Sequence, residues 1–470
     1  MRKLLFLLLV SACSSPKDIP DYSERYERII NGIQPSLQIE GEEIPTFSIE
    51  ERLKEKGIPG MSLAVYHDGE IWSSTYGMAD VGENRKVDHA TMFLAGSISK
   101  PVAAIRAHQL VEEGKLLLDG NVNDYLTSWH LPDNEYTINE KVTLRRILNH
   151  TAGLTVWGFP GYDNGDEIPS VPDVLDGKGN TDSVRVYKEP GESWMYSGGG
   201  YTIIQLMITD VTGESFPTTM QKYVLDPLEM RESTYENPIP KKYHANIATG
   251  YRGNGDEVEG KWPIYPEMAA AGLWTTASQL LQYGIEIQRI HQTKEDGILK
   301  YETVEEMLTP GMNGHGLGPG VSEYTFGHGG ADEGFRAQLT VWKDMPYAVV
   351  VMVNSDNGSI NREVLSAIAK EFDLPGVVPN IKKVVQKTDE NLSMYTGKFN
   401  IPDYGELKID IEDNHLIING GFLDETIHLA AENDTLFFDR KDGTAIDFTI
   451  GEEDVTGFRV QGLEAIRIND

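Results

Sequence analysis

The sequence has 470 residues, with 41 Lys and Arg against 73 Asp and Glu, which gives a formal net charge of −32 at pH 7. A chain of this length exceeds what one hydrophobic core usually organises, so we expect a large domain and a smaller one. The acidic excess repels phosphate backbones and therefore disfavours nucleic acid as a partner.

The N-terminal residues are typical of an export signal. Arg2 and Lys3 precede an apolar run, Leu4–Val10, and small residues follow up to Cys13. The run is much shorter than the roughly 20 residues of a membrane-spanning helix, so we expect a signal peptide over residues 1–12. Residues 10–13 also resemble the bacterial lipobox, and Cys13 is the only cysteine in the chain. This predicts a periplasmic lipoprotein held to the membrane at Cys13, with an incidental cysteine in an ordinary signal as the alternative.

The segment that follows is polar and contains several prolines without sustained periodicity, which predicts a lipoprotein tether over residues 13–45 that includes at most one short helix. A larger domain is then expected over residues 46–378. It opens with two apolar runs, Met61–Tyr66 and Ile71–Tyr76, on either side of a His-Asp-Gly turn. This pattern is typical of a β-hairpin.

A buried helix is predicted from Ile98 to Glu113, because its apolar and small residues cover much of the circumference. Pro101 lies in its first turn and Gly114 follows its last residue, as expected at helix ends. Further helices are expected at 144–149, 201–211 and 277–291, and strands at 338–342 and 348–353. Helices and antiparallel strands without a regular βαβ repeat indicate an α+β fold.

Short alternating runs dominate beyond about residue 390. Asx and Gly turn residues separate them at roughly ten-residue spacing, as at Asp413-Asn414, Asn433-Asp434 and Asp442-Gly443. This is typical of a small antiparallel barrel or sandwich, and we predict a β-barrel domain over residues 379–470.

Ser97 and Lys100 lie at the start of the predicted buried helix. A spacing of three places both on one helix face, so that the amine can exchange a proton with the hydroxyl. The free N–H groups of a helix N-terminus are suited to a developing oxyanion. The pattern Ser-x-x-Lys is short, however, and also occurs at Ser14–Lys17. Other motifs are therefore needed to decide whether Ser97 and Lys100 are catalytic.

Three motifs in order provide that context. Residues 95–101, preceded by Thr-Met-Phe, resemble the nucleophile segment of the class C β-lactamase and D,D-peptidase family. Tyr196-Ser197-Gly198 lies where that family carries Tyr-x-Asn, and His328-Gly329-Gly330 resembles its Lys-Thr-Gly or His-x-Gly element. Residues 148–154 and 271–275 are also similar, so the resemblance covers about residues 50 to 370.

The resemblance implies a β-lactamase/transpeptidase-like domain, in which an antiparallel sheet is flanked by helices and carries a helical subdomain. It implies a serine hydrolase without a cofactor that forms an acyl-enzyme on Ser97, with Lys100 and Tyr196 sharing the proton transfers. The backbone N–H groups of Ser97 and Ala331 would form the oxyanion hole. Substrate contacts would come from Gly198, His328, Gly329 and Gly330. The C-terminal region, which opens at Tyr395, resembles the lipocalin-like barrels appended to some relatives.

Two departures from the family pattern bear on the substrate, which we expect to be a small molecule or peptide. Gly198 lacks the usual side-chain amide, and His328 replaces a permanent cation that would bind a carboxylate. Both changes favour amide or ester bonds of D-amino-acid peptides or small esters. The alternatives are a β-lactamase or D,D-carboxypeptidase, and a catalytically silent peptidoglycan-binding protein.

Other mechanisms find less support in the sequence. No Gly-x-Ser-x-Gly occurs, so a nucleophile elbow is absent and we interpret His150 as structural. The 11 histidines show no His-Glu-x-x-His spacing, so no metal site is expected. The loop from Trp157 to Asp182 is expected to shape the substrate pocket.

Overall fold

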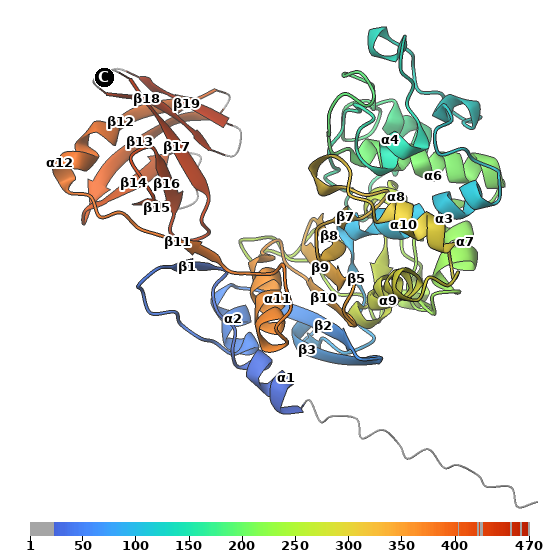
Figure 1. Ribbon diagram of the computed structural model, residues 1–470, viewed down its shortest axis with the longest axis horizontal. Helices are drawn as coiled ribbons and strands as arrows, with labels where there is room; N and C mark the ends of the chain where they lie inside the picture. Colours follow the sequence, from blue (N-terminus) through green and yellow to red (C-terminus); the bar gives the residue numbers. More distant parts are fainter. Residues whose placement is uncertain are drawn as a thin grey trace, which may run out of the picture.

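The computed structural model describes residues 23–402, 404–420, 423, 426–451, 454–460 and 463–468. The predicted signal peptide and Cys13 lie outside these residues. The described chain forms a helix-and-sheet domain and a separate closed barrel, so the predicted α+β fold with a C-terminal β-barrel is confirmed (Figure 1). Within the described ranges, no helix is long and apolar enough to cross a membrane.

The larger domain is organised around a seven-stranded sheet with the order β4-β3-β2-β10-β9-β8-β7, in which all neighbours are antiparallel. The predicted hairpin is present, with Val65 opposite Trp72 and a turn at Asp68-Gly69 where both residues have positive φ. The strands are β2 Gly60–His67, β3 Glu70–Asp80, β4 Arg85–Lys86, β7 Gly320–Val321, β8 Thr325–Asp332, β9 Phe335–Trp342 and β10 Tyr347–Val353.

One face of this sheet is covered by α1 Ser23–Ile30, α2 Ile49–Glu55 and α11 Ser359–Glu371 (Figure 1). Tyr26 and Ile29 of α1 are buried in the same apolar cluster as Val364 of α11. The structure thus differs from the predicted tether from Ser23 onward, because an amphipathic helix there packs on the sheet and becomes part of the domain core.

The opposite face carries a larger apolar core built on α3 Ser99–Glu112 and the helices around it. The residues of α3 are buried over nearly the whole circumference of the helix, as the sequence predicted. The helices predicted at 144–149, 201–211 and 277–291 are also present. The remaining elements are α4 Leu144–Leu148, α5 Val171–Leu175, α6 Gly198–Thr212, α7 Phe216–Met220, α8 Met268–Ala271, α9 Ala277–Thr293, α10 Tyr301–Met307, β5 Phe93–Leu94 and β6 Trp274–Thr275.

The C-terminal barrel is closed by antiparallel pairing of β12 with β19. Its interior is filled with rings, among them Phe399, Phe437, Phe448 and Phe458, whose nearest centroids are 5.1 to 5.5 Å apart. Its elements are α12 Asp389–Leu392, β12 Gly397–Ile401, β13 Gly405–Glu412, β14 His415–Gly420, β15 Ile427–Ala431, β16 Leu436–Asp439, β17 Ala445–Ile450, β18 Val455–Val460 and β19 Leu463–Ile468.

A short parallel strand pair joins the two parts of the molecule. β1 Leu37–Ile39 pairs with β11 Asn380–Lys382, which lies in the linker before the barrel (Figure 1). Two ion pairs add to this junction: Lys382 with Glu432 at 2.7 Å, and Glu42 with Arg440 at 2.8 Å. The segment between α1 and α2 is therefore paired with the linker that leads to the barrel.

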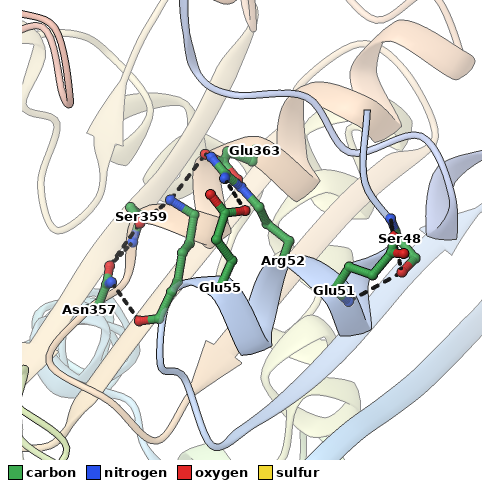
Figure 2. A network of polar contacts seen from close by, with 8 residues as sticks. Ser48, Glu51, Arg52, Glu55, Asn357, Ser359 and Glu363 are labelled. Atoms are coloured by element: carbon green, nitrogen blue, oxygen red, sulfur yellow. Dashed lines mark hydrogen bonds and ion pairs between the residues drawn. The ribbon is translucent and has the colours of Figure 1, made fainter. Parts of the chain in front are cut away.

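A polar clamp fastens α2 to the start of α11 (Figure 2). Arg52 donates Nε to Glu363 Oε2 at 2.8 Å and Nη2 to Glu363 Oε1 at 2.7 Å, and both side chains are buried. Lys56 Nζ donates to Ser359 Oγ at 2.8 Å. Ser48 and Glu51 form a capping box that starts α2. The clamp fixes the N-terminus of α11, which forms one wall of the cavity described next.

Candidate active site

The nucleophile turn lies directly against the edge of the sheet. Ser97 belongs to a short 3-10 turn, Gly96–Ile98, that leads into α3. Gly96 has φ +54°, and a β-carbon there would lie 2.5 Å from the backbone nitrogen of Ala331 on β8. A side chain at either Gly96 or Gly330 would meet backbone atoms of the other segment. Glycine at both positions lets β8 approach Ser97 closely.

Lys100 holds its amine at the Ser97 hydroxyl. Nζ donates to Ser97 Oγ at 2.9 Å and to the carbonyl oxygen of Ala270 on α8 at 2.8 Å. Only 2% of Lys100 is exposed. The structure thus brings together the predicted Ser-Lys pair, and the second hydrogen bond fixes the direction in which the amine points.

Tyr196 lies over the same amine. Its ring centroid is 5.0 Å from Lys100 Nζ and 4.2 Å from the ring of His150. His150 is buried, and its Nδ1 accepts a hydrogen bond from the backbone N–H of Ser197 at 3.1 Å. His150 therefore supports the segment that carries Tyr196, in line with its interpretation as a structural residue.

Two more imidazoles surround Tyr196. His328 on β8 and His315 in the preceding loop have ring centroids 6.0 and 6.2 Å from the Tyr196 ring. Burial, reinforced by the nearby Lys100 cation, lowers the pKa of His328 to about 3 and that of His315 to about 4. Both imidazoles are neutral at pH 7. The sequence analysis missed His315, whose only signal is its place in a glycine-rich stretch.

A cavity of about 600 Å³ opens above Ser97. Its lining includes the predicted residues Lys100, Tyr196, His328, Gly329, Gly330 and Ala331, the loop segment Trp157–Phe159, and Gly358, Asn361 and Arg362 at the start of α11. Gly198 lies behind this lining, because a β-carbon there would be 3.0 Å from Cε2 of Phe159. The Trp157 loop shapes the pocket, whereas Gly198 contacts it only through Phe159 and Trp157.

Two buried acids lie near the catalytic groups, and the sequence analysis missed both. Asp332 follows Ala331 at the end of β8, and burial raises its pKa to about 8. Burial also raises the pKa of Glu267 to about 8, and neither carboxylate oxygen of Glu267 has a hydrogen-bond partner among the described residues. Among all residues that the structure describes, no group of three or more His, Cys, Asp or Glu side chains is arranged to hold a metal ion.

Comparisons with known proteins show what the chain is similar to in sequence and in fold. The sequence profile of the family described as Beta-lactamase matches residues 48–370. Penicillin-binding protein 4* of Bacillus subtilis (strain 168) is 23% identical over 435 residues, which are 85% of this chain and 92% of the relative.

Two solved structures are similar in fold. The octameric penicillin-binding protein homologue from Pyrococcus abyssi superposes with a TM-score of 0.60 at 20% identity, covering 89% of this chain and 98% of that one. The D-amino acid amidase from Ochrobactrum anthropi SV3, complexed with L-phenylalanine amide, superposes with a TM-score of 0.57 at 20% identity, covering 69% and 97%.

Proposed function

Because the chain belongs to the β-lactamase family, we propose that it is a serine hydrolase that forms an acyl-enzyme on Ser97. The observation that carries the proposal is the 2.9 Å contact between Lys100 Nζ and Ser97 Oγ at the floor of a cavity of about 600 Å³. A hydroxyl becomes an effective nucleophile when an adjacent base takes its proton.

In the first half of the reaction, Ser97 Oγ attacks the substrate carbonyl while its proton passes to Lys100 in its free-amine form or to Tyr196 in its phenolate form. The backbone N–H groups of Ser97 and Ala331 stabilise the oxyanion. The intermediate then collapses, the bond to the leaving amine or alcohol breaks, and the leaving group takes the proton. In the second half, water attacks the acyl-enzyme carbonyl, releases the acid and returns the proton to Ser97.

We propose amides or esters of D-amino-acid peptides, or small esters, as the substrate class. A neutral His328 provides no cation at its own position on β8, where a lysine would face the carboxylate that penicillins carry, although Arg336 and Arg362 also line the cavity. The fold that the chain shares with a D-amino acid amidase is compatible with this choice.

A β-lactamase or D,D-carboxypeptidase is the second candidate. It is favoured by the similarity to penicillin-binding protein 4*, which extends over most of both chains. The two candidates share the acylation step and differ in which acyl group the cavity accepts.

The test treats the protein and its Ser97→Ala variant with a fluorophosphonate probe and with fluorescent penicillin. Fluorophosphonate labelling that is lost in the variant, without penicillin labelling, is the expected result. Stable penicillin labelling would favour the carboxypeptidase, and rapid hydrolysis of the penicillin would favour the β-lactamase. Labelling by neither probe would contradict the hydrolase and support a silent binding protein.

We further propose that the protein is exported and anchored in the periplasm by a lipid on Cys13. The proposal rests on the basic start, the short apolar run and the small residues before the single cysteine. Cys13→Ser is expected to move the protein from the membrane fraction to the soluble fraction, and unchanged fractionation would contradict lipidation.

A further inference from the structure

The geometry points to an aromatic acyl subsite: we infer that the loop segment Trp157–Phe159 selects substrates whose acyl part carries an aromatic or other bulky apolar group. The inference rests on the proposed acylation of Ser97 and names the substrate class of that site. Ser97, Trp157, Phe159 and Tyr196 line one cavity. The wall formed by Trp157 and Phe159 is called the aromatic wall below.

The aromatic wall is held by the N-terminus of α6. The backbone N–H groups of Gly198 and Gly199 donate to the carbonyl oxygens of Trp157 and Val156 at 3.0 and 3.1 Å. Ser197 Oγ donates to the carbonyl oxygen of Thr155 at 2.8 Å. Three consecutive carbonyl oxygens of the loop thus accept hydrogen bonds from the start of α6, which follows Tyr196 in the chain. The wall and Tyr196 therefore form one fixed unit.

The loop is strained where it enters the wall. Val156 has φ +62°, and a β-branched residue in the left-handed region is a rare outlier because its side chain crowds the backbone. Such strain persists only when surrounding contacts impose it, and it concentrates at functional sites. Here the imposed conformation presents Trp157 to the cavity.

Trp157 presents a large apolar surface to solvent. It is 72% exposed, and its ring centroid lies 5.6 Å from that of Tyr196. An exposed indole in the cavity of the nucleophile has a free face for an aromatic group of the substrate, in addition to its contact with Tyr196, since aromatic pairs prefer centroid separations of about 4.5 to 7 Å. An acyl substituent on the Trp157 side of Ser97 would cover this surface and remove it from water.

Gly198 makes the second half of the wall possible. A β-carbon at this position would lie 3.0 Å from Phe159 Cε2 and 3.1 Å from the carbonyl oxygen of Trp157. Any side chain there would push the wall outward or place another group between it and the cavity. With glycine at this position, the site loses the polar side-chain amide usual in the family and gains the apolar ring of Phe159. An apolar ring there suits an apolar substituent on the substrate.

The test measures ligand selectivity without requiring turnover. Fluorophosphonate labelling of Ser97 is competed with 2-phenylethylboronic acid and with ethylboronic acid, which differ only in the aromatic ring. We expect the aryl compound to compete at a concentration at least about tenfold lower, the discrimination typical of an apolar pocket. Trp157→Ala is expected to reduce that ratio at least about fivefold while Ser97 is still labelled.

Two matched controls separate the wall from general effects. Ile138→Ala changes an equally exposed apolar side chain, at 73%, that does not line the cavity, and the ratio is expected to stay unchanged. Gly198→Ala is expected to lower the ratio by displacing Phe159, whereas Gly253→Ala, where the nearest atom lies 4.0 Å from the added carbon, is expected to leave it unchanged.

The outcomes distinguish the two proposals. Labelling with no preference for the aryl compound, or a preference that survives Trp157→Ala, would overturn the aromatic subsite and leave the hydrolase intact. Absence of labelling in the unaltered protein would overturn the hydrolase and, with it, the subsite.

Discussion

At the scale of single residues, His328 determines whether the β8 edge of the cavity carries a charge beside Arg336 and Arg362, which also line it. His328 lies on the edge strand β8, and its pKa of about 3 leaves it neutral at neutral pH. A lysine at the same place would bring a cation to within reach of a ligand carboxylate.

His328→Lys is therefore expected to raise the low residual rate of acylation by fluorescent penicillin by about tenfold, which corresponds to about 1.4 kcal/mol of added stabilisation. The measurement is the second-order labelling rate, with His328→Gln as the uncharged control. An equal rate in His328→Lys and His328→Gln would show that charge at this position does not decide penicillin recognition.

Glu267 makes stability depend on pH. Its pKa is 4.5 when unfolded and about 8 when folded, because burial penalises the carboxylate. The unfolded chain therefore ionises first at this position, so the contribution of Glu267 to the free energy of unfolding is highest below pH 4.5 and decreases as pH rises to about 8.

Glu267→Gln removes the ionisation while keeping the shape of the side chain. We expect the variant and the parent to have similar thermal midpoints near pH 5, and the variant to be more stable by several degrees at pH 8. Thermal unfolding followed by circular dichroism across this range is the measurement. A pH-independent difference would mean that Glu267 does not titrate in the folded state.

The sequence alone predicts those site residues that belong to a short local motif. Ser97 and Lys100 share a helix face, and Tyr196 precedes a helix that starts at three glycines. His315, Glu267 and Asp332 could not be found in this way. Their pKa shifts arise from burial, to which the charge of Lys100 adds for His315 alone, and burial is set by the tertiary packing of distant segments.

At the scale of the elements, long periodic segments were the most predictable. The helix at Ile98–Glu113 and the hairpin around Asp68-Gly69 agree with α3 and with β2 and β3. The sequence allows one short helix in the predicted tether but does not predict that this helix, α1, packs on the sheet, because its amphipathic face gains its stability only from α11 and the sheet. The sequence indicates β12 only through the motif at Tyr395 that opens the barrel and does not predict it as a strand.

The clamp between α2 and α11 makes a quantitative prediction. Arg52→Ala leaves the buried carboxylate of Glu363 without its bidentate partner and is expected to lower the free energy of unfolding by about 3 to 5 kcal/mol. The contact from Lys56 to Glu363 at 3.3 Å moderates the loss. Urea unfolding followed by fluorescence measures it.

The matched control for the clamp is an exposed ion pair between neighbouring helices. Arg28 is 56% exposed and pairs with Glu371, so Arg28→Ala is expected to lower the free energy of unfolding much less than Arg52→Ala does. Equal losses in the two variants would show that burial does not distinguish these pairs.

At the scale of the whole molecule, the barrel has its own apolar core, whose buried members run from Leu392 to Ala465. The larger domain buries two other clusters that share no residue with it. Separate cores predict separate cooperative transitions on heating.

Phe448→Ala removes a ring from the barrel interior and is expected to destabilise the barrel by about 3 to 5 kcal/mol. In calorimetry, only one of two transitions should move to lower temperature, and the fluorophosphonate labelling rate of Ser97 should stay unchanged. A single transition, or two that shift together, would show that the parts unfold as one unit.

The pairing of β1 with β11 has a consequence for inheritance. Leu37 and Asn380 lie opposite each other, so the linker to the barrel leaves the larger domain beside a strand of that domain. A recombination event at this boundary could add, exchange or delete the downstream barrel by altering a single junction, while the cavity and its catalytic residues pass unchanged to the descendant gene. The pairing of β1 with β11 thus marks the position in the chain at which new domain combinations can arise.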